Sequence, residues 1–218
     1  MIEAINPYIV KILITAKDGD SIRAISKRIG LSYAWSYNWI QKLVEIRIIK
    51  RKGQKIEIDK KNKIYKEFKS FIRRVLKERL NLADGYLLPN LTGLEYAFSS
   101  IDAVFIWTKG GYNIGRSKDS YPIFIEVLKK DLDGWCKFFD DFYINYSKRI
   151  ERKRKIYFIL ISKKKIEREF VNGVSVISLK KTVEYAKKYI YNFEPALEML
   201  NQMYNLNIKI KYAEKEMM

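Results

Sequence analysis

The N-terminal segment contains three short runs of apolar residues at helical spacing. The first run begins at Pro7, and its apolar face is formed by Tyr8, Ile9, Ile12 and Leu13. A second helix is predicted between a capping Ser21 and Gly30, with apolar positions at Ile22, Ile25 and Ile29. Ser32 can cap a third helix over about residues 33–46, whose inner face is formed by Ser36, Ile40, Leu43 and Val44. The pattern therefore predicts three helices joined by tight turns.

The next segment has the alternating pattern of a β-hairpin. Two Ile-containing runs within residues 47–58 flank Lys52-Gly53, which predicts two strands and a basic turn. Because the turn around Gly30-Leu31-Ser32 is short, the second and third helices form a helix-turn-helix. Three helices followed by such a hairpin make up a winged helix.

Residues 60–83 are predicted to form one long amphipathic helix. Its apolar stripe consists of Ile64, Phe68, Phe71, Ile72, Val75 and Leu76, and lysines and arginines cover the other faces. The stripe is too apolar to remain in water. The stripe can be buried by packing against the rest of the chain or by dimerisation, and both interpretations remain open.

Beyond Asp84-Gly85, where we place a domain boundary, the pattern becomes mixed α/β. A short helix is expected at 92–100 and a hairpin return at 110–115. Strands are expected at 102–107, 121–127, 156–161 and 174–177, and helices at 131–147, 179–191 and 193–205.

Composition narrows the chemistry that the chain can perform. The 218 residues include no His and one Cys, Cys136, which excludes His-ligated zinc, all-cysteine metal sites, structural disulfides and His-dependent catalytic triads. No apolar run is long enough to span a membrane, and the first residues lack the layout of a signal peptide, so we expect a soluble, cytoplasmic protein. The high content of Ile, Lys, Tyr and Asn is typical of an archaeal or thermophilic composition.

Positive charge is concentrated in the N-terminal part. The net charge is +18, and residues 1–80, with 20 basic and 8 acidic side chains, account for 12 of these charges. A concentrated positive field attracts a polyanion, and phosphate neutralisation supplies most of the non-specific affinity for DNA.

Residues 5–60 resemble the winged-helix transcriptional regulators of bacteria and archaea. The resemblance is carried by the run from Ile22 to Ser32, by Trp39-Ile40-Gln41-Lys42-Leu43 and by the Ile48-Ile49 strand. It implies that the third helix enters the major groove, where Asn and Gln can bond adenine and an Ala methyl can meet thymine, and that basic side chains contact phosphate. The DNA-binding residues expected on this basis are Arg23, Lys27, Arg28, Ser32, Tyr33, Ala34, Tyr37, Asn38, Gln41, Lys42, Arg51, Lys52 and Lys55.

Trp35 and Trp39, four residues apart on the same helix, allow two interpretations. They can pack against the wing or the first helix, or they can stack on a flipped base.

A basic run in the C-terminal part can provide a second contact with the DNA backbone. Its residues Lys148, Arg149, Arg152 and Lys153 follow the helix predicted at 131–147. The alternative interpretation of these charges is a solvated loop.

Three catalytic interpretations of the C-terminal part are incomplete. Lys109-Gly110-Gly111 ahead of Glu126 is similar to a nucleotidyltransferase turn, but Phe124 stands where the first carboxylate belongs. Asp102, Glu126 and Lys129 suggest a metal-dependent nuclease, but Lys129 lies one residue too far along. The segment 109–116 does not match a P-loop, and a tight turn that needs positive φ explains its glycines better.

Residues 92–127 also loosely resemble the C-terminal half of abortive-infection-type antitoxin regulators. That resemblance is carried by Thr92-Gly93-Leu94 and by the run from Thr108 to Tyr112. It implies a protein partner or a role in repression, without catalysis.

The sequence thus predicts an α+β protein with a winged helix domain at 1–59, a connecting helix at 60–83 and a mixed α/β domain at 84–218. The expected function is that of a sequence-specific transcriptional regulator that is not an enzyme. Its expected partners are double-stranded DNA and a second copy in a homodimer, and the C-terminal domain can bind another protein. No cofactor, metal or membrane is expected. The alternative is a nuclease or nucleotidyltransferase-like enzyme that a winged helix directs to DNA.

Overall fold

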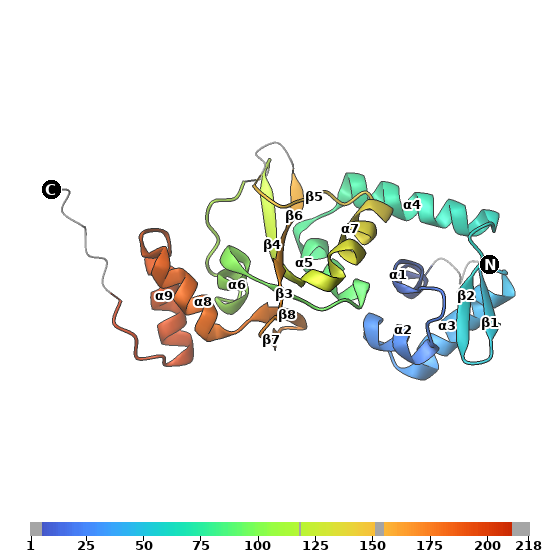
Figure 1. Cartoon of the computed structure of the whole chain (residues 1–218), viewed down its shortest axis with the longest axis horizontal. Coiled ribbons are helices and arrows are strands. Elements are labelled where there is room, and N and C mark those ends of the chain that lie inside the picture. The colour runs from blue at the N-terminus through green and yellow to red at the C-terminus, as the bar shows by residue number, and fades with distance from the viewer. Residues whose placement is uncertain (1–5, 118, 151–154, 211–218) are drawn as a thin grey trace. The chain divides into compact units, whose positions relative to one another are not determined.

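A computed structural model describes residues 6–117, 119–150 and 155–210 (Figure 1). The fold is mixed α+β, as the sequence predicts. The chain divides into two compact units, of which the first comprises residues 1–94 and 134–144 and the second residues 95–133 and 145–218.

The first unit begins with three helices and a hairpin, at the places that the sequence predicts. Their bounds are α1 Pro7–Thr15, α2 Ile22–Ile29, α3 Tyr33–Glu45, β1 Ile49–Lys52 and β2 Lys55–Ile58. The predicted caps form, because the hydroxyl of Ser21 accepts from the amide of Ala24 at 3.2 Å and Gly30 adopts φ 69°. The core of this group contains Ile9, Ile12, Ile25, Ile40, Leu43 and Ile48, all at 0% exposure.

The long helix predicted at 60–83 is confirmed as helix α4, which ends a few residues earlier than predicted and is followed by a further helix, α5. Helix α4 covers Lys63–Arg79 and helix α5 covers Leu82–Thr92. Asn62 caps α4 by accepting from the amide of Tyr65 at 3.1 Å, and Asn81 caps α5 by accepting from the amide of Asp84 at 2.9 Å. The expected boundary at Asp84-Gly85 therefore lies inside α5 rather than between elements.

Helix α7, Leu132–Asp141, is shorter than the helix predicted at 131–147, and residues 134–144 belong to the first unit. Trp135 and Phe139 are fully buried. Asp141 forms ion pairs at 3.4 Å with Lys69 and Arg73 of α4. These contacts join α7 to α4.

The second unit is built on a six-stranded mixed sheet with the strand order β5-β6-β4-β3-β8-β7. The strands are β3 Tyr96–Phe98, β4 Tyr121–Leu128, β5 Tyr146–Ser147, β6 Ile156–Lys163, β7 Arg168–Val171 and β8 Val174–Ile177. The helices are α6 Ser100–Trp107, α8 Leu179–Lys188 and α9 Ile190–Tyr204, with a short 3-10 turn at Lys129–Asp131. The strands expected at 121–127, 156–161 and 174–177 are confirmed, and so are the last two helices.

Three predictions for the C-terminal part are wrong. Residues 102–107, expected as a strand, form helix α6, and the segment 92–100, expected as a helix, contains strand β3. Strand β3 forms because it pairs on one side with β4 and on the other with β8, which are contacts from distant parts of the chain. Residues 110–115 form a loop instead of a hairpin, although Gly110 and Gly115 have the expected positive φ of 84° and 71°.

Candidate nucleic-acid interface

Helix α3 is anchored by its inner face and leaves the outer face open. Ser36 and Ile40 are fully buried, and the Ser36 hydroxyl donates to the carbonyl of Ser32 at 3.0 Å. On a helix the residues about half a turn away from this pair point in the opposite direction. Accordingly Ala34 and Asn38 are exposed and Gln41 is half-buried. These three side chains form the outward face that the sequence predicts.

Ser32 has a local role in α3. Its hydroxyl accepts from the amide of Trp35 at 3.3 Å, which satisfies one of the free amides at the start of the helix. This bond fixes where α3 begins and so determines which side chains face outward.

The predicted wing is a two-stranded hairpin that a third segment extends. Strands β1 and β2 pair with Lys52 opposite Lys55, and Gly53 adopts φ 62° in the turn between them. The amide of Ile56 donates to the carbonyl of Asp20 at 2.9 Å, so the residues before α2 run alongside β2. The hairpin is thereby fixed to the helix-turn-helix.

The basic side chains of the wing are exposed. Arg51, Lys52 and Lys55 all lie on the surface. The amino group of Lys52 lies 2.6 Å from a carboxylate oxygen of Glu57, and this hydrogen bond raises the pKa of Lys52. Lys52 thus remains protonated at neutral pH but already has an acidic neighbour.

A direct contact connects the wing to α3. The guanidinium of Arg51 donates to the hydroxyl of Tyr37 at 3.3 Å and lies 5.3 Å from the centroid of the same ring. The ring of Tyr33 follows at 6.1 Å from that of Tyr37. Tyr33, Tyr37 and Arg51 therefore link the outward face of α3 to the hairpin in one basic and aromatic surface. We call this surface, with Ala34, Asn38, Gln41, Lys52 and Lys55, the helix–wing face.

Two of the three basic residues predicted on α2 are available to a ligand. Arg23 and Lys27 are exposed. Arg28 is not, because its guanidinium holds both carboxylate oxygens of Asp20, at 2.6 and 2.7 Å, and also donates to the carbonyl of Thr15 at 3.1 Å. Only 20% of the Arg28 side chain is exposed. We therefore assign Arg28 a structural role and leave it out of the interface.

The two tryptophans of α3 pack against the first helix. The rings of Trp35 and Trp39 stack with their centroids 6.4 Å apart, and Tyr8 of α1 lies 6.4 and 6.3 Å from them. The sequence leaves open whether the tryptophans pack within the domain or stack on a flipped base, and in the structure they pack against the first helix. Trp35 nevertheless remains 56% exposed, and the amino group of Lys42 lies 5.0 Å from the Trp39 ring. This aromatic cluster flanks the helix–wing face. The spacing of the two tryptophans in the sequence does not predict that Tyr8 of α1 contacts both of them.

The second predicted basic patch belongs to the other unit. Lys148 and Arg149 are exposed in the segment after β5. Arg152 and Lys153 lie outside the described residues. The patch therefore belongs to a different unit from the helix–wing face.

The acidic residues singled out in the second unit do not come together as metal ligands. Asp102 is completely buried on α6, pairs with Arg116 at 2.5 Å and accepts from the amide of Phe124 at 2.6 Å. Glu126 on β4 lies 3.6 Å from Lys163 on the neighbouring strand β6, and Lys129 is exposed in the 3-10 turn. In the described part of the chain no three potential protein ligands gather around one point.

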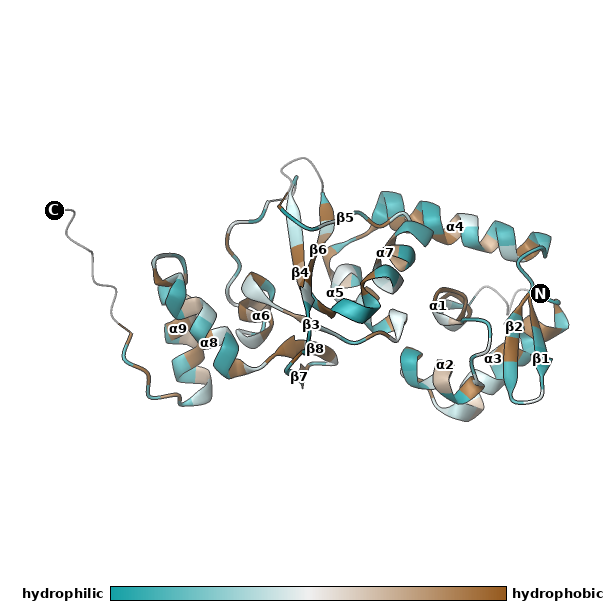
Figure 2. Cartoon of the chain, viewed as in Figure 1, coloured by the Kyte–Doolittle hydropathy of each residue, from teal (hydrophilic) through white to brown (hydrophobic). Residues whose placement is uncertain are grey.

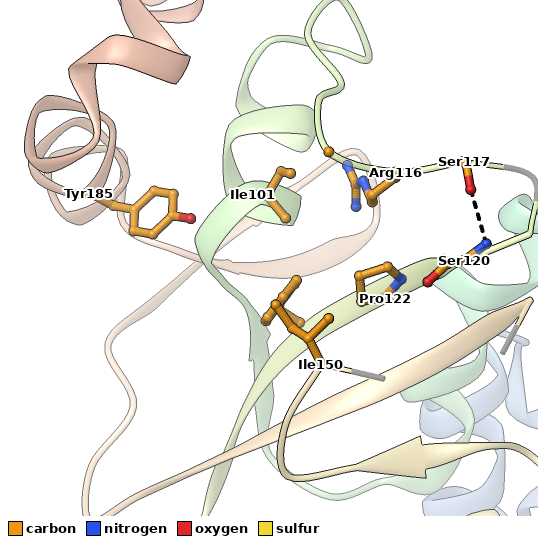
Figure 3. Close-up of a pocket in the computed structure, with 9 residues that line it drawn as sticks. Ile101, Arg116, Ser117, Ser120, Pro122, Ile150 and Tyr185 are labelled. Carbon is orange, nitrogen blue, oxygen red and sulfur yellow. Dashed lines mark hydrogen bonds between the residues drawn. The ribbon is translucent and has the colours of Figure 1, made fainter. Parts of the chain in front are cut away.

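The loop after α6 forms part of a pocket of about 590 Å³ (Figure 3). The loop contributes Arg116, Ser117 and Ser120, and further walls come from Ile101 and Tyr185. Burial raises the pKa of the Tyr185 phenol, so this group stays protonated at neutral pH. The described lining offers the Arg116 guanidinium, hydroxyl groups and apolar walls, and it contains no carboxylate.

No helix in the described residues is long and apolar enough to cross a membrane. Comparison of the chain with protein-family models, with curated proteins and with solved structures gives no match in any of the three.

Proposed function

We propose that the chain is a sequence-specific transcriptional regulator that binds double-stranded DNA through the helix–wing face. The observation that supports this most strongly is the link between Arg51 and Tyr37, because it makes a projecting helix and a basic hairpin into one surface. A helix of this kind fits the major groove, and cationic side chains beside it neutralise the neighbouring phosphates.

Each part of the surface has its own task in this proposal. Asn38 and Gln41 carry amide groups that can bond the edge of an adenine in the major groove, and Ala34 offers a methyl group to thymine. Arg23, Lys27 and Lys55 are exposed cations that suit backbone phosphates. The helix–wing face contains no arginine directed from α3, so we expect an A·T-rich target.

The test is selection of bound fragments from genomic DNA of the source organism, followed by footprinting of the enriched sites. A regulator protects a defined site and leaves plasmid DNA intact in Mg²⁺ or Mn²⁺. If the purified chain enriches no sequence and its affinity is the same for every duplex, sequence-specific regulation is refuted.

The alternative, an enzyme directed to DNA by the winged helix, is tested in the same preparation. Nicking of plasmid that depends on the divalent metal and is lost in Glu126→Ala supports that alternative. Asp133→Ala is a suitable control, since Asp133 is an exposed carboxylate on helix α7 rather than on β4. Nicking that persists in Glu126→Ala would instead point to a contaminating nuclease.

A further inference from the structure

Within the described residues, helix α4 is anchored to the first unit along one side. Tyr65 and Ile72 are buried within the first unit, and Lys69 and Arg73 on the adjacent face pair with Asp141. Figure 2 shows α4 as mostly hydrophilic, with hydrophobic patches along its length. Part of this hydrophobic surface lies away from the anchored side.

The open side carries large apolar residues. Phe71 is 61% exposed, Ile64 is 42% exposed and Val75 is 40% exposed, and Phe68 between them is half-buried. These four residues follow one another at intervals of four, three and four, which is the spacing of a coiled-coil seam. An exposed stripe of this length indicates a contact surface.

The charges beside the stripe show which partner fits it. Glu67 and Arg74 lie one heptad apart on the same edge of the stripe, each just before an apolar seam residue. If two copies of α4 pack antiparallel, Phe68 meets Phe71 of the second copy and Ile64 meets Val75 of the second copy. In that register Glu67 of each copy faces Arg74 of the other, so both charge pairs are satisfied at once by the two-fold symmetry.

A parallel arrangement fits less well. It would bring Arg74 close to Arg79 of the second copy, which are like charges, and Glu67 close to Ile72, which is buried in its own unit. The antiparallel pair is therefore the arrangement that the charges and the apolar residues both favour.

We propose that the open face of α4 (Ile64, Glu67, Phe68, Phe71, Arg74 and Val75) is a homodimer interface in which α4 packs antiparallel against α4 of a second copy. This inference goes beyond the proposed function and does not depend on it, because the contact forms without DNA. It also gives the assembly two helix–wing faces, as recognition of two half-sites requires.

The experiment is a charge exchange in the full chain, with the dimer dissociation constant measured by analytical ultracentrifugation without DNA. Glu67→Arg alone and Arg74→Glu alone each place like charges opposite one another twice. Each is expected to weaken the dimer by about tenfold or more. The double variant Glu67→Arg/Arg74→Glu restores opposite charges and is expected to return to within about threefold of the unmodified chain.

Mixing the two single variants gives a second readout. A chain with arginine at both positions and a chain with glutamate at both positions complement each other, so their equimolar mixture forms a heterodimer tighter than either variant alone. Lys77→Glu makes the same type of charge change at an exposed position of α4 outside this edge, and the dimer should be unaffected. All the substituted residues are exposed, and circular dichroism is used to check that each variant folds.

Three results would overturn the interface. They are an unmodified chain that is monomeric at all concentrations, a dimer that the single variants do not weaken, and a mixture that fails to associate better than its components. Since the measurement contains no DNA, such a failure leaves the proposed DNA binding untouched. A loss of DNA binding in chains that still dimerise would likewise leave the interface standing.

Discussion

The placement of Arg28 predicts that two neighbouring cations of α2 have opposite roles. Replacing Arg28 by Met removes two charged hydrogen bonds to Asp20 and one bond to the Thr15 carbonyl. Replacing Lys27 by Met removes an exposed charge from the same helix. The first change should lower stability and the second should lower DNA affinity.

The magnitude for Arg28→Met follows from the burial of the pair. Breaking a fully buried ion pair costs about 3–5 kcal/mol, since it leaves an uncompensated charge inside the protein. Here 20% of the Arg28 side chain and 11% of the Asp20 side chain are exposed, so water can solvate part of the remaining carboxylate. We therefore expect a loss of about 2–3 kcal/mol in the free energy of unfolding. For a unit of this size that corresponds to a fall of roughly 10 °C in the melting temperature.

Calorimetry measures the stability, and fluorescence anisotropy with a labelled duplex at several salt concentrations measures the DNA contact. Arg28→Met should melt earlier but keep the salt dependence of binding at temperatures where it is folded. Lys27→Met should melt normally and reduce the slope of log K against log salt by about 0.9. If Arg28→Met melts normally and lowers the slope instead, the structural role that we give to Arg28 is wrong.

Three further predictions concern the helix–wing face and its support. The double variant Lys52→Ala/Lys55→Ala should weaken binding to all duplexes and reduce the salt slope by between about 1 and 2, because Glu57 already partly neutralises Lys52. If the control variant Lys61→Ala/Lys63→Ala weakens binding by the same amount, the loss of affinity comes from the net charge and not from the position of the wing lysines. Asn38→Ala should cost about 1–3 kcal/mol on the specific site and relax the preference at one base pair, and equal losses on specific and random DNA would contradict base reading. A hydrogen bond from Lys60 and another from the Ile58 amide lower the pKa of Asp18 from its ordinary value of 3.8. The ionised carboxylate therefore stabilises the fold at pH values above 3.8, and this stabilisation is lost as the pH falls through the lowered pKa of the folded state. Urea unfolding of Asp18→Asn should thus show a deficit at pH 7 that shrinks toward pH 2, and a deficit independent of pH would refute this assignment.

Local signals in the sequence were sufficient to predict the first half of the fold. Ser21, Gly30 and Ser32 act through bonds to residues within a few positions, so the ends of α2 and α3 can be predicted without the rest of the chain. The basic hairpin is likewise specified by its own turn. The outward residues of α3 follow from these bounds and the helical repeat.

The second half depends on distant contacts that the pattern does not reveal. The run at 102–107 contains Val, Phe, Ile and Trp and has no clear period, so a buried helix and a buried strand look alike at this length. Its Asp102 is stabilised by Arg116 and by the Phe124 amide, which are brought close only by the tertiary fold. The role of Arg28 was missed for the same kind of reason. Its charge suggested a phosphate contact, but its partner Asp20 becomes visible only when α2 and the preceding loop are in place.

The return of residues 134–144 to the first unit has a practical consequence for anyone who dissects this chain. A fragment that ends after Leu94 retains helices α1–α3 and the β1–β2 hairpin but loses Trp135 and Phe139, two fully buried rings, and also Asp141, which pairs with both Lys69 and Arg73. Such a truncated piece would expose apolar surface and uncompensated cations on α4, and its poor solubility would say little about the intact protein. The first unit is best isolated by grafting the returning helix back through a designed linker, rather than by a single cut.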